Sequence, residues 1–208
     1  MTRRWLAAAA AVAAVAAAGC SSTSASVPAV GSAAAGSDGA GLVGQATCED
    51  PPGDLRAVTG STPQSLVAGT DLRRVEITAD GQALTVAFTA TSAIPELLPD
   101  DAVGPVRWVV WTLDGERVLH QLRVALDQDG WQVTFEAGDD RFDLDASVER
   151  TDETMKVTFP LEALHDLGDQ FGWVALTTQG QPAVQDVCPD AASQSLAPEV
   201  QLMFPGRP

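Results

Sequence analysis

DLRRVEITADGQALTVAFTA, at residues 71–90, decides the fold class of this 208-residue chain. Apolar residues take every second position over 75–79 and again over 84–90. Such a period of two places apolar side chains on one face of a β-strand. The pair Asp80-Gly81 between the two runs favours a two-residue hairpin turn. The stretch therefore predicts an antiparallel hairpin with one buried face.

The same pattern continues through the rest of the chain. Residues 106–113 (VRWVVWTL) are apolar on both faces, which predicts a central strand, and Asp114-Gly115 turns the chain into a strand over 118–126. Further strands are predicted over 131–135, 142–148, 155–159 and 171–178. One short helix is predicted over 160–167.

Short strands, Gly-containing turns and the lack of crossover helices together predict an all-β fold. We expect an antiparallel β-sandwich with jelly-roll or immunoglobulin-like connections. A parallel α/β sheet is disfavoured, because its strands need helical crossovers.

The N-terminus has the form of an export signal over residues 1–19. Arg3 and Arg4 precede an apolar run over 5–18 that is short for a membrane span. The run ends in AAGC, which resembles the lipobox of bacterial lipoproteins. That resemblance implies cleavage before Cys20 and acylation of its sulfur; the alternative is an ordinary secretory cleavage site nearby. Lipidation of Cys20 predicts a protein held on the extracytoplasmic face of the cell membrane by its acyl chains.

Composition divides the remainder into three parts. Residues 20–47 are rich in Ala, Gly and Ser and predict a flexible linker. Residues 48–190 predict one β-sandwich domain, and 191–208 a C-terminal tail. The alternation of Val200, Leu202 and Phe204 leaves two alternatives for the tail, a docked edge strand or a loose end.

Charge and motifs exclude two function classes. The formal net charge is −16, and removal of residues 1–19, which hold Arg3 and Arg4 but no acidic residue, makes it −18. Nucleic acid is therefore not expected as a partner, because phosphate binding needs a basic surface. The sequence also lacks the hydrolase, metalloprotease and nucleotide-binding motifs, and it has 2 histidines, so we expect no enzyme activity.

Two cysteines, Cys48 and Cys188, bracket the predicted domain and are expected to form a disulfide bond in an exported protein. A redox pair is disfavoured, because no C-x-x-C motif is present. The bond would draw the stretches CEDPPGD (48–54) and DVCPD (186–190) together. Carboxylates gathered in this way suit calcium, and the alternative is that they only form turns. The candidate calcium ligands are Asp50, Asp54, Asp186 and Asp190.

The order of these features is similar to that of DOMON-like sandwiches and family 9 carbohydrate-binding modules. The similarity rests on DPPGD at 50–54, the stretch at 71–91, VTFPLEAL at 157–164 and FGWVALTT at 171–178. It implies a ligand-binding sandwich without catalysis, found in that superfamily with sugars or haem and often with structural calcium. The candidate ligand-binding residues are Trp108, Trp111 and His120.

The expected strand faces limit how these three residues can bind one ligand. Trp108 and Trp111 are three residues apart on one strand, so they are expected on opposite faces. His120 shares a face with apolar residues, where a hydrogen-bonded core histidine is the alternative.

Two functions follow. The first is a membrane-anchored lipoprotein whose sandwich binds a glycan, a small apolar ligand or an envelope protein. The second is a structural or protein-interaction module of the cell envelope without a small-molecule site.

Overall fold

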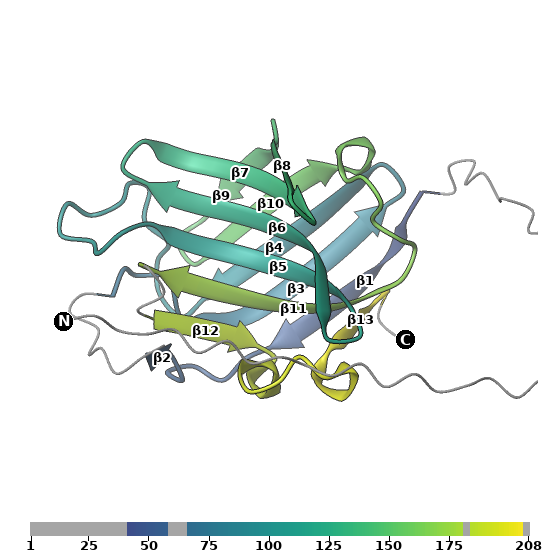
Figure 1. Ribbon diagram of the computed structural model, residues 1–208. Coiled ribbons are helices and arrows are strands. Elements are labelled where there is room, and N and C mark those ends of the chain that lie inside the picture. The colour runs from purple at the N-terminus through teal and green to yellow at the C-terminus, as the bar shows by residue number, and fades with distance from the viewer. Residues whose placement is uncertain (1–40, 58–65, 181–183, 206–208) are drawn as a thin grey trace, which may run out of the picture. The chain divides into compact units, whose positions relative to one another are not determined.

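Two antiparallel β-sheets packed face to face make up the part of the chain that the computed structural model describes, residues 41–57, 66–180 and 184–205 (Figure 1). Sheet A has the strand order β1-β3-β4-β10-β9. Sheet B has the order β2-β12-β11-β5-β6-β7-β8, and β13 pairs with β11. The predicted all-β antiparallel sandwich is confirmed.

The strands of sheet A are β1 (Val43–Glu49), β3 (Leu72–Asp80), β4 (Ala83–Ala90), β9 (Ser147–Arg150) and β10 (Thr154–Pro160). The strands of sheet B are β2 (Arg56–Ala57), β5 (Val106–Asp114), β6 (Arg117–Asp127), β7 (Gly130–Ala137), β8 (Asp140–Asp143), β11 (Phe171–Gln179), β12 (Val184–Cys188) and β13 (Leu202–Phe204).

The hairpin of residues 71–90 forms as predicted, as β3 and β4. Ile77 lies opposite Val86, and both side chains are fully buried. Gly81 has a φ of 93°, a left-handed conformation that glycine adopts without strain. The Asp80 carboxylate accepts the backbone N–H groups of Gln82 and Ala83, both at 2.9 Å, and this closes the turn.

The strand predicted over 142–148 divides into two strands in different sheets. β8 pairs with β7 in sheet B, and β9 pairs with β10 in sheet A. Leu144 still donates its N–H to the Val133 carbonyl at 2.9 Å, after which the chain crosses to the other sheet. Both strands point their apolar side chains at the same interior, so the period of two runs through the crossing without a break.

The ends of the domain differ from the expected boundaries. β1 begins at Val43, inside the segment predicted as linker, and β12 was not predicted as a strand. In the tail, β13 pairs with β11, and the rings of Phe171 and Phe204 stack at 5.1 Å. Of the two alternatives for the tail, the structure shows the docked edge strand.

The helix predicted over 160–167 is a single 3-10 turn, η1 (Leu161–Ala163). Asp166 has a φ of 61°, which lies outside the right-handed helical region. Two more 3-10 turns, η2 (Asp190–Ser193) and η3 (Pro198–Val200), lie in the C-terminal segment.

The main core fills the space between the sheets. Its largest fully buried side chains are Trp108, Trp173, Phe88, Phe135, Phe159 and Phe204. A smaller apolar cluster lies on the outer face of sheet B, where Val109, Val174 and Leu176 pack with Ala192 of the C-terminal segment. The described ranges contain no helix with the length and apolar character that a membrane span requires.

Candidate metal centre

A disulfide bond between Cys48 of β1 and Cys188 of β12 joins the two sheets, with the Cα atoms 6.1 Å apart. Asp50 follows Cys48 by two residues, and Asp186 precedes Cys188 by two. Residues two apart along a strand share a face. The predicted disulfide is therefore confirmed, and it brings both carboxylates to the same place between the sheets.

Asp54 reaches this place through the turn that follows β1. Asp50 still donates its N–H to the Arg73 carbonyl at 2.9 Å, and the chain then turns back at Pro52-Gly53. Gly53 has a φ of 85°, and its N–H lies 3.0 and 3.2 Å from the two carboxylate oxygens of Asp71. These contacts fix the turn, and the turn brings Asp54 toward Asp186.

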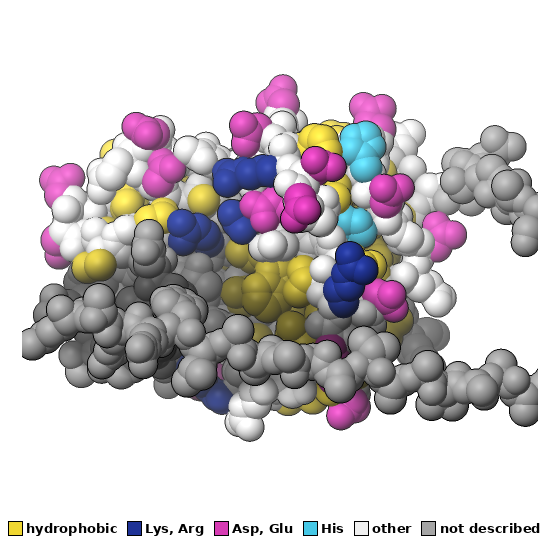
Figure 2. Space-filling view, in the orientation of Figure 1, with side chains coloured by type: hydrophobic (Ala, Val, Ile, Leu, Met, Phe, Trp, Pro, Cys, Tyr) yellow, Lys and Arg dark blue, Asp and Glu magenta, His cyan; other side chains and the backbone are white. Residues whose placement is uncertain are grey.

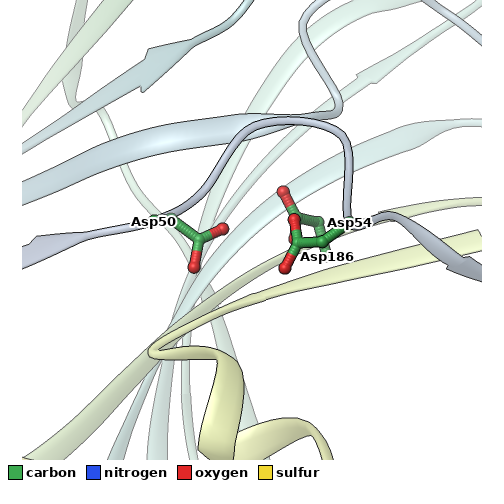
Figure 3. Close-up of side chains that lie close together, drawn as sticks. All are labelled: Asp50, Asp54 and Asp186. Atoms are coloured by element: carbon green, nitrogen blue, oxygen red, sulfur yellow. The ribbon is translucent and has the colours of Figure 1, made fainter.

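Three carboxylates converge here: one oxygen from each of Asp50, Asp54 and Asp186 lies within 4.8 Å of the other two. Figure 3 shows the carboxyl group of Asp50 on one side and those of Asp54 and Asp186 together on the other. Asp50 is 4% exposed and Asp186 is 2% exposed. We refer to these three residues as the aspartate cluster.

Hydrogen bonding differs sharply within the aspartate cluster. Asp186 accepts the N–H of Leu72 at one oxygen and that of Val187, at 2.9 Å, at the other. Both carboxylate oxygens of Asp50 and both of Asp54 are buried and have no hydrogen-bond partner among the described residues. Buried polar atoms in folded proteins nearly always have a partner, so four such oxygens in one place indicate a missing cation or proton.

Burial and mutual repulsion favour the protonated form of these groups. Burial, with the negative charge of Asp186, raises the pKa of Asp50 to about 8. Burial also raises the pKa of Asp186 to about 6, although the Leu72 N–H opposes the shift. Burial and the neighbouring Asp190 raise the pKa of Asp54. Without a cation, the cluster holds at least one shared proton near neutral pH.

Two other acidic residues of these stretches have partners of their own. Asp190, the fourth candidate ligand, lies beside the aspartate cluster and accepts a hydrogen bond from Arg56 at 3.1 Å. Glu49 pairs with Arg74 at 3.0 Å. Of the four candidate calcium ligands, the structure brings three together and places Asp190 next to them.

A cavity of about 250 Å³ opens beside the cluster, and Asp54 and Asp186 form part of its wall. The other residues of the wall are Arg56, Gln185, Val187, Asp190 and Ser193. Sequence reasoning gave no role to four of the wall residues: Arg56, Gln185, Val187 and Ser193. Proximity to the two cysteine stretches was the one signal that could have drawn attention to them.

The candidate aromatic ligands separate as the strand pattern predicts. Trp108 points into the core, has no exposed surface and stacks on Trp131 at 5.5 Å. Trp111 lies on the opposite, outer face of sheet B, is partly exposed, and donates its indole N–H to Gln121 at 3.2 Å. Of these two tryptophans, Trp111 is therefore the one that a ligand outside the sandwich can reach.

His120 is a core residue. It is 6% exposed, its Nδ1 lies 2.8 Å from the Thr112 hydroxyl, and its ring stacks on Phe135 at 5.4 Å. Burial lowers the pKa of His120, which keeps the imidazole neutral. Of the two alternatives for His120, the structure shows the hydrogen-bonded core histidine.

The outer face of sheet B faces the viewer in Figure 2, where basic and acidic side chains border a recessed apolar area. On this face Arg123 forms an ion pair with Glu136 at 2.9 Å, next to Gln121 and Trp111. The face thus combines a partly exposed indole ring with polar hydrogen-bonding groups.

No family model, curated protein or solved structure matches this chain. The predicted lipidation site, Cys20, lies outside the described residues. The chemical character of the site therefore rests on the aspartate cluster itself. Carboxylate oxygens without a nearby histidine or thiol suit a hard divalent cation.

Proposed function

We propose that this chain is a lipid-anchored, extracytoplasmic β-sandwich that binds a divalent cation, calcium by ligand chemistry, and acts without catalysis. One observation carries the cation: the four buried oxygens of Asp50 and Asp54, which lack hydrogen-bond partners, converge on Asp186. A bound cation would give each of these oxygens a partner. It would also replace the repulsion between the carboxylates by attraction.

Calcium fits this donor set better than softer metals do. The ligands come from two segments far apart in the sequence, at 50–54 and at 186, and all of them are carboxylates. Calcium accepts such oxygen ligands in irregular arrangements, whereas magnesium demands a nearly ideal octahedron. Zinc and copper sites usually include imidazole or thiolate ligands. We therefore assign the site to calcium.

Absence of catalysis is proposed from where the candidate groups lie. His120 is held in the core by Thr112, and His165 is exposed with its ring against Phe142. The Thr112 hydroxyl beside His120 is fully buried, and the ring of His165 packs against an apolar side chain. Neither histidine thus serves as a base for a nucleophile that a substrate can reach, as general acid–base or covalent catalysis requires.

Membrane attachment is proposed from the sequence of residues 1–20. Arg3, Arg4, the apolar run and AAGC together support export and acylation of Cys20. Mass spectrometry of the protein from its native membrane provides the test. The wild type should exceed the mass of the unmodified chain from Cys20 onward by the mass of the acyl groups, and the Cys20→Ala variant should carry no acyl mass. A wild type without acyl mass would overturn the anchor.

Calorimetric titration with calcium, with purified protein that starts at Gly41 or earlier and so keeps all of β1, tests the cation. We expect saturable binding by the wild type and no binding by Asp50→Asn, which loses a buried ligand. Glu49→Gln is the matched control, because Glu49 lies in the same segment, pairs with Arg74 and is not part of the aspartate cluster, so the change should leave calcium binding nearly unchanged. Equal affinities of the wild type and Asp50→Asn would contradict the proposal.

The outer face of sheet B favours a second candidate function, a module that binds an envelope protein or glycan at Trp111. The partly exposed indole lies beside Gln121 and the Arg123–Glu136 pair. Titration of tryptophan fluorescence with cell-envelope fractions, with Trp111→Phe compared with wild type, tests this function. A spectral change that persists unaltered in Trp111→Phe would place the binding elsewhere.

A further inference from the structure

The cavity beside the aspartate cluster gives a bound cation contact with solvent and with any ligand that enters. Two of the three cluster residues, Asp54 and Asp186, belong to its wall. Its volume of about 250 Å³ is enough for a small organic molecule rather than for water alone. The cavity and the cation site are thus parts of one site.

A calcium ion held by the aspartate cluster would keep some coordination positions open toward the cavity. Calcium takes about six to eight oxygen ligands. Asp186 already accepts a backbone N–H at each oxygen, from Leu72 and from Val187, which limits what it offers the ion. The carboxylates of Asp50 and Asp54 therefore provide most of the protein ligands, and several positions remain for oxygen atoms that enter through the cavity.

Charge selects the kind of ligand. The four carboxylates of Asp50, Asp54, Asp186 and Asp190 bring four negative charges, against one positive charge on Arg56 and two on the ion. The occupied site keeps a net charge of −1, so it repels an anion, and an organic cation would compete with the metal. A neutral ligand meets neither obstacle.

Hydroxyl groups are the neutral oxygens that suit this arrangement. A hydroxyl can coordinate the ion through its oxygen while it donates its hydrogen to a carboxylate. Two adjacent hydroxyls can occupy two neighbouring positions of the ion, and this chelation favours binding over that of separate molecules. The cavity wall also offers Gln185 for a further hydrogen bond.

We propose that this cavity binds a neutral sugar through the bound cation, with two adjacent hydroxyl groups on the ion and a further hydrogen bond to Gln185. The proposal rests on the cation binding proposed above and names the class of ligand for that site. The ligand is a glycan residue with a free pair of adjacent hydroxyls.

Terbium luminescence tests both steps separately. Tb³⁺ takes the place of calcium at oxygen sites, and its decay rates in H₂O and D₂O give the number of water molecules on the ion. We expect methyl α-mannoside, methyl α-glucoside or methyl α-galactoside to displace about two of these waters from the protein-bound ion. Deoxy analogues that lack one of the paired hydroxyls should displace fewer.

The outcomes distinguish the two proposals. If the wild type fails to bind Tb³⁺ at the aspartate cluster, the cation proposal itself is wrong. If Tb³⁺ binds and its water count stays the same with every sugar of the panel, the sugar proposal alone is overturned.

Two variants place the sugar in the cavity. Ser193→Phe fills the cavity without removal of a cluster carboxylate, so Tb³⁺ should still bind but the sugars should no longer displace water. Ser195→Phe, at an exposed position of the same segment, is the matched control and should behave as wild type. Gln185→Ala provides a milder change, with several-fold weaker sugar binding and unchanged Tb³⁺ affinity. Water displacement by sugars that survives in Ser193→Phe, or a sugar affinity that is unchanged in Gln185→Ala, would contradict the proposal.

Discussion

Asp50 and Asp186 stand at mirrored positions about the disulfide bond: Asp50 lies two residues after Cys48, and Asp186 lies two residues before Cys188. Cys48 lies one residue before the last pair of β1 with β3 in sheet A, and Cys188 is in the last pair of β12 with β11 in sheet B. The bond therefore fixes the two carboxylates at the boundary between the sheets. Each is nearly fully buried. A covalent link thus holds together two groups that repel each other when ionised.

Stability of the calcium-free protein should fall as the pH rises from 5 to 8. The pKa of Asp50 is raised from 3.8 to about 8, so the folded protein binds more protons than the unfolded chain over this range. Excess proton binding by the folded state makes stability decrease with pH. Thermal unfolding in the presence of a chelator measures this. A melting temperature that stays constant or rises over the range would contradict the shift.

Calcium should reverse that trend. The ion binds ionised carboxylates, so its affinity should increase with pH and its binding should release protons. At a concentration about 100-fold above the dissociation constant it should stabilise the fold by about 2.7 kcal/mol, or about 5–10 °C in melting temperature. Thermal unfolding scans at pH 5 and pH 8, with and without calcium, give the rise in melting temperature that calcium causes at each pH. A larger rise in melting temperature at pH 5 than at pH 8 would argue against binding by the aspartate cluster.

Asp50→Asn should stabilise the protein when no calcium is present. The substitution replaces a carboxyl group that must either take up a proton or stay buried as an ion. The neutral amide avoids this cost and can donate a hydrogen bond to the Asp186 carboxylate, a gain of about 1–2 kcal/mol. Urea unfolding in a chelator gives the free energy of unfolding. Glu49→Gln, on an exposed ion pair with Arg74, should change it by less than about 1 kcal/mol. A marked loss of stability in Asp50→Asn would show that the carboxylates of the aspartate cluster do not repel one another.

Loss of the disulfide bond should weaken both the fold and the cation site. The bond closes a loop of 140 residues, for which the chain-entropy model gives about 5 kcal/mol. Cys48→Ala with Cys188→Ala should lower the free energy of unfolding by an amount of this order. It should also lower calcium affinity, because the two halves of the cluster are no longer held. Unchanged calcium affinity in a folded double variant would show that the cation site does not depend on the disulfide bond.

Substitution of the two tryptophans of β5 should have very different effects. Trp108 is fully buried and donates its N–H to the Gly69 carbonyl at 3.1 Å, so Trp108→Ala should cost about 3–5 kcal/mol of unfolding free energy. Trp111→Ala, on the partly exposed outer face, should cost clearly less. Urea unfolding followed by circular dichroism compares the two. Equal losses would contradict the assignment of the two faces.

Local patterns were enough to predict most strands. Residues 71–90 specify a hairpin through alternation and an Asp-Gly turn, and both signals act between neighbours in sequence. The same local rule missed the division of 142–148 between β8 and β9, because both strands bury side chains in one interior and the alternation does not change. It also missed β12, a five-residue strand in which the charged Asp186 takes a buried position, so its apolar residues do not alternate.

By itself, the sequence determined the antiparallel sandwich, the opposite faces of Trp108 and Trp111, and the pairing of Cys48 with Cys188. Each depends on a period of two or on a count of cysteines. Only the tertiary structure decided which aspartates converge: Asp54 joins Asp50 and Asp186, while Asp190 turns to Arg56. The physical reason is that burial and the position of one guanidinium group, which arise from packing between distant segments, separate otherwise equivalent carboxylates.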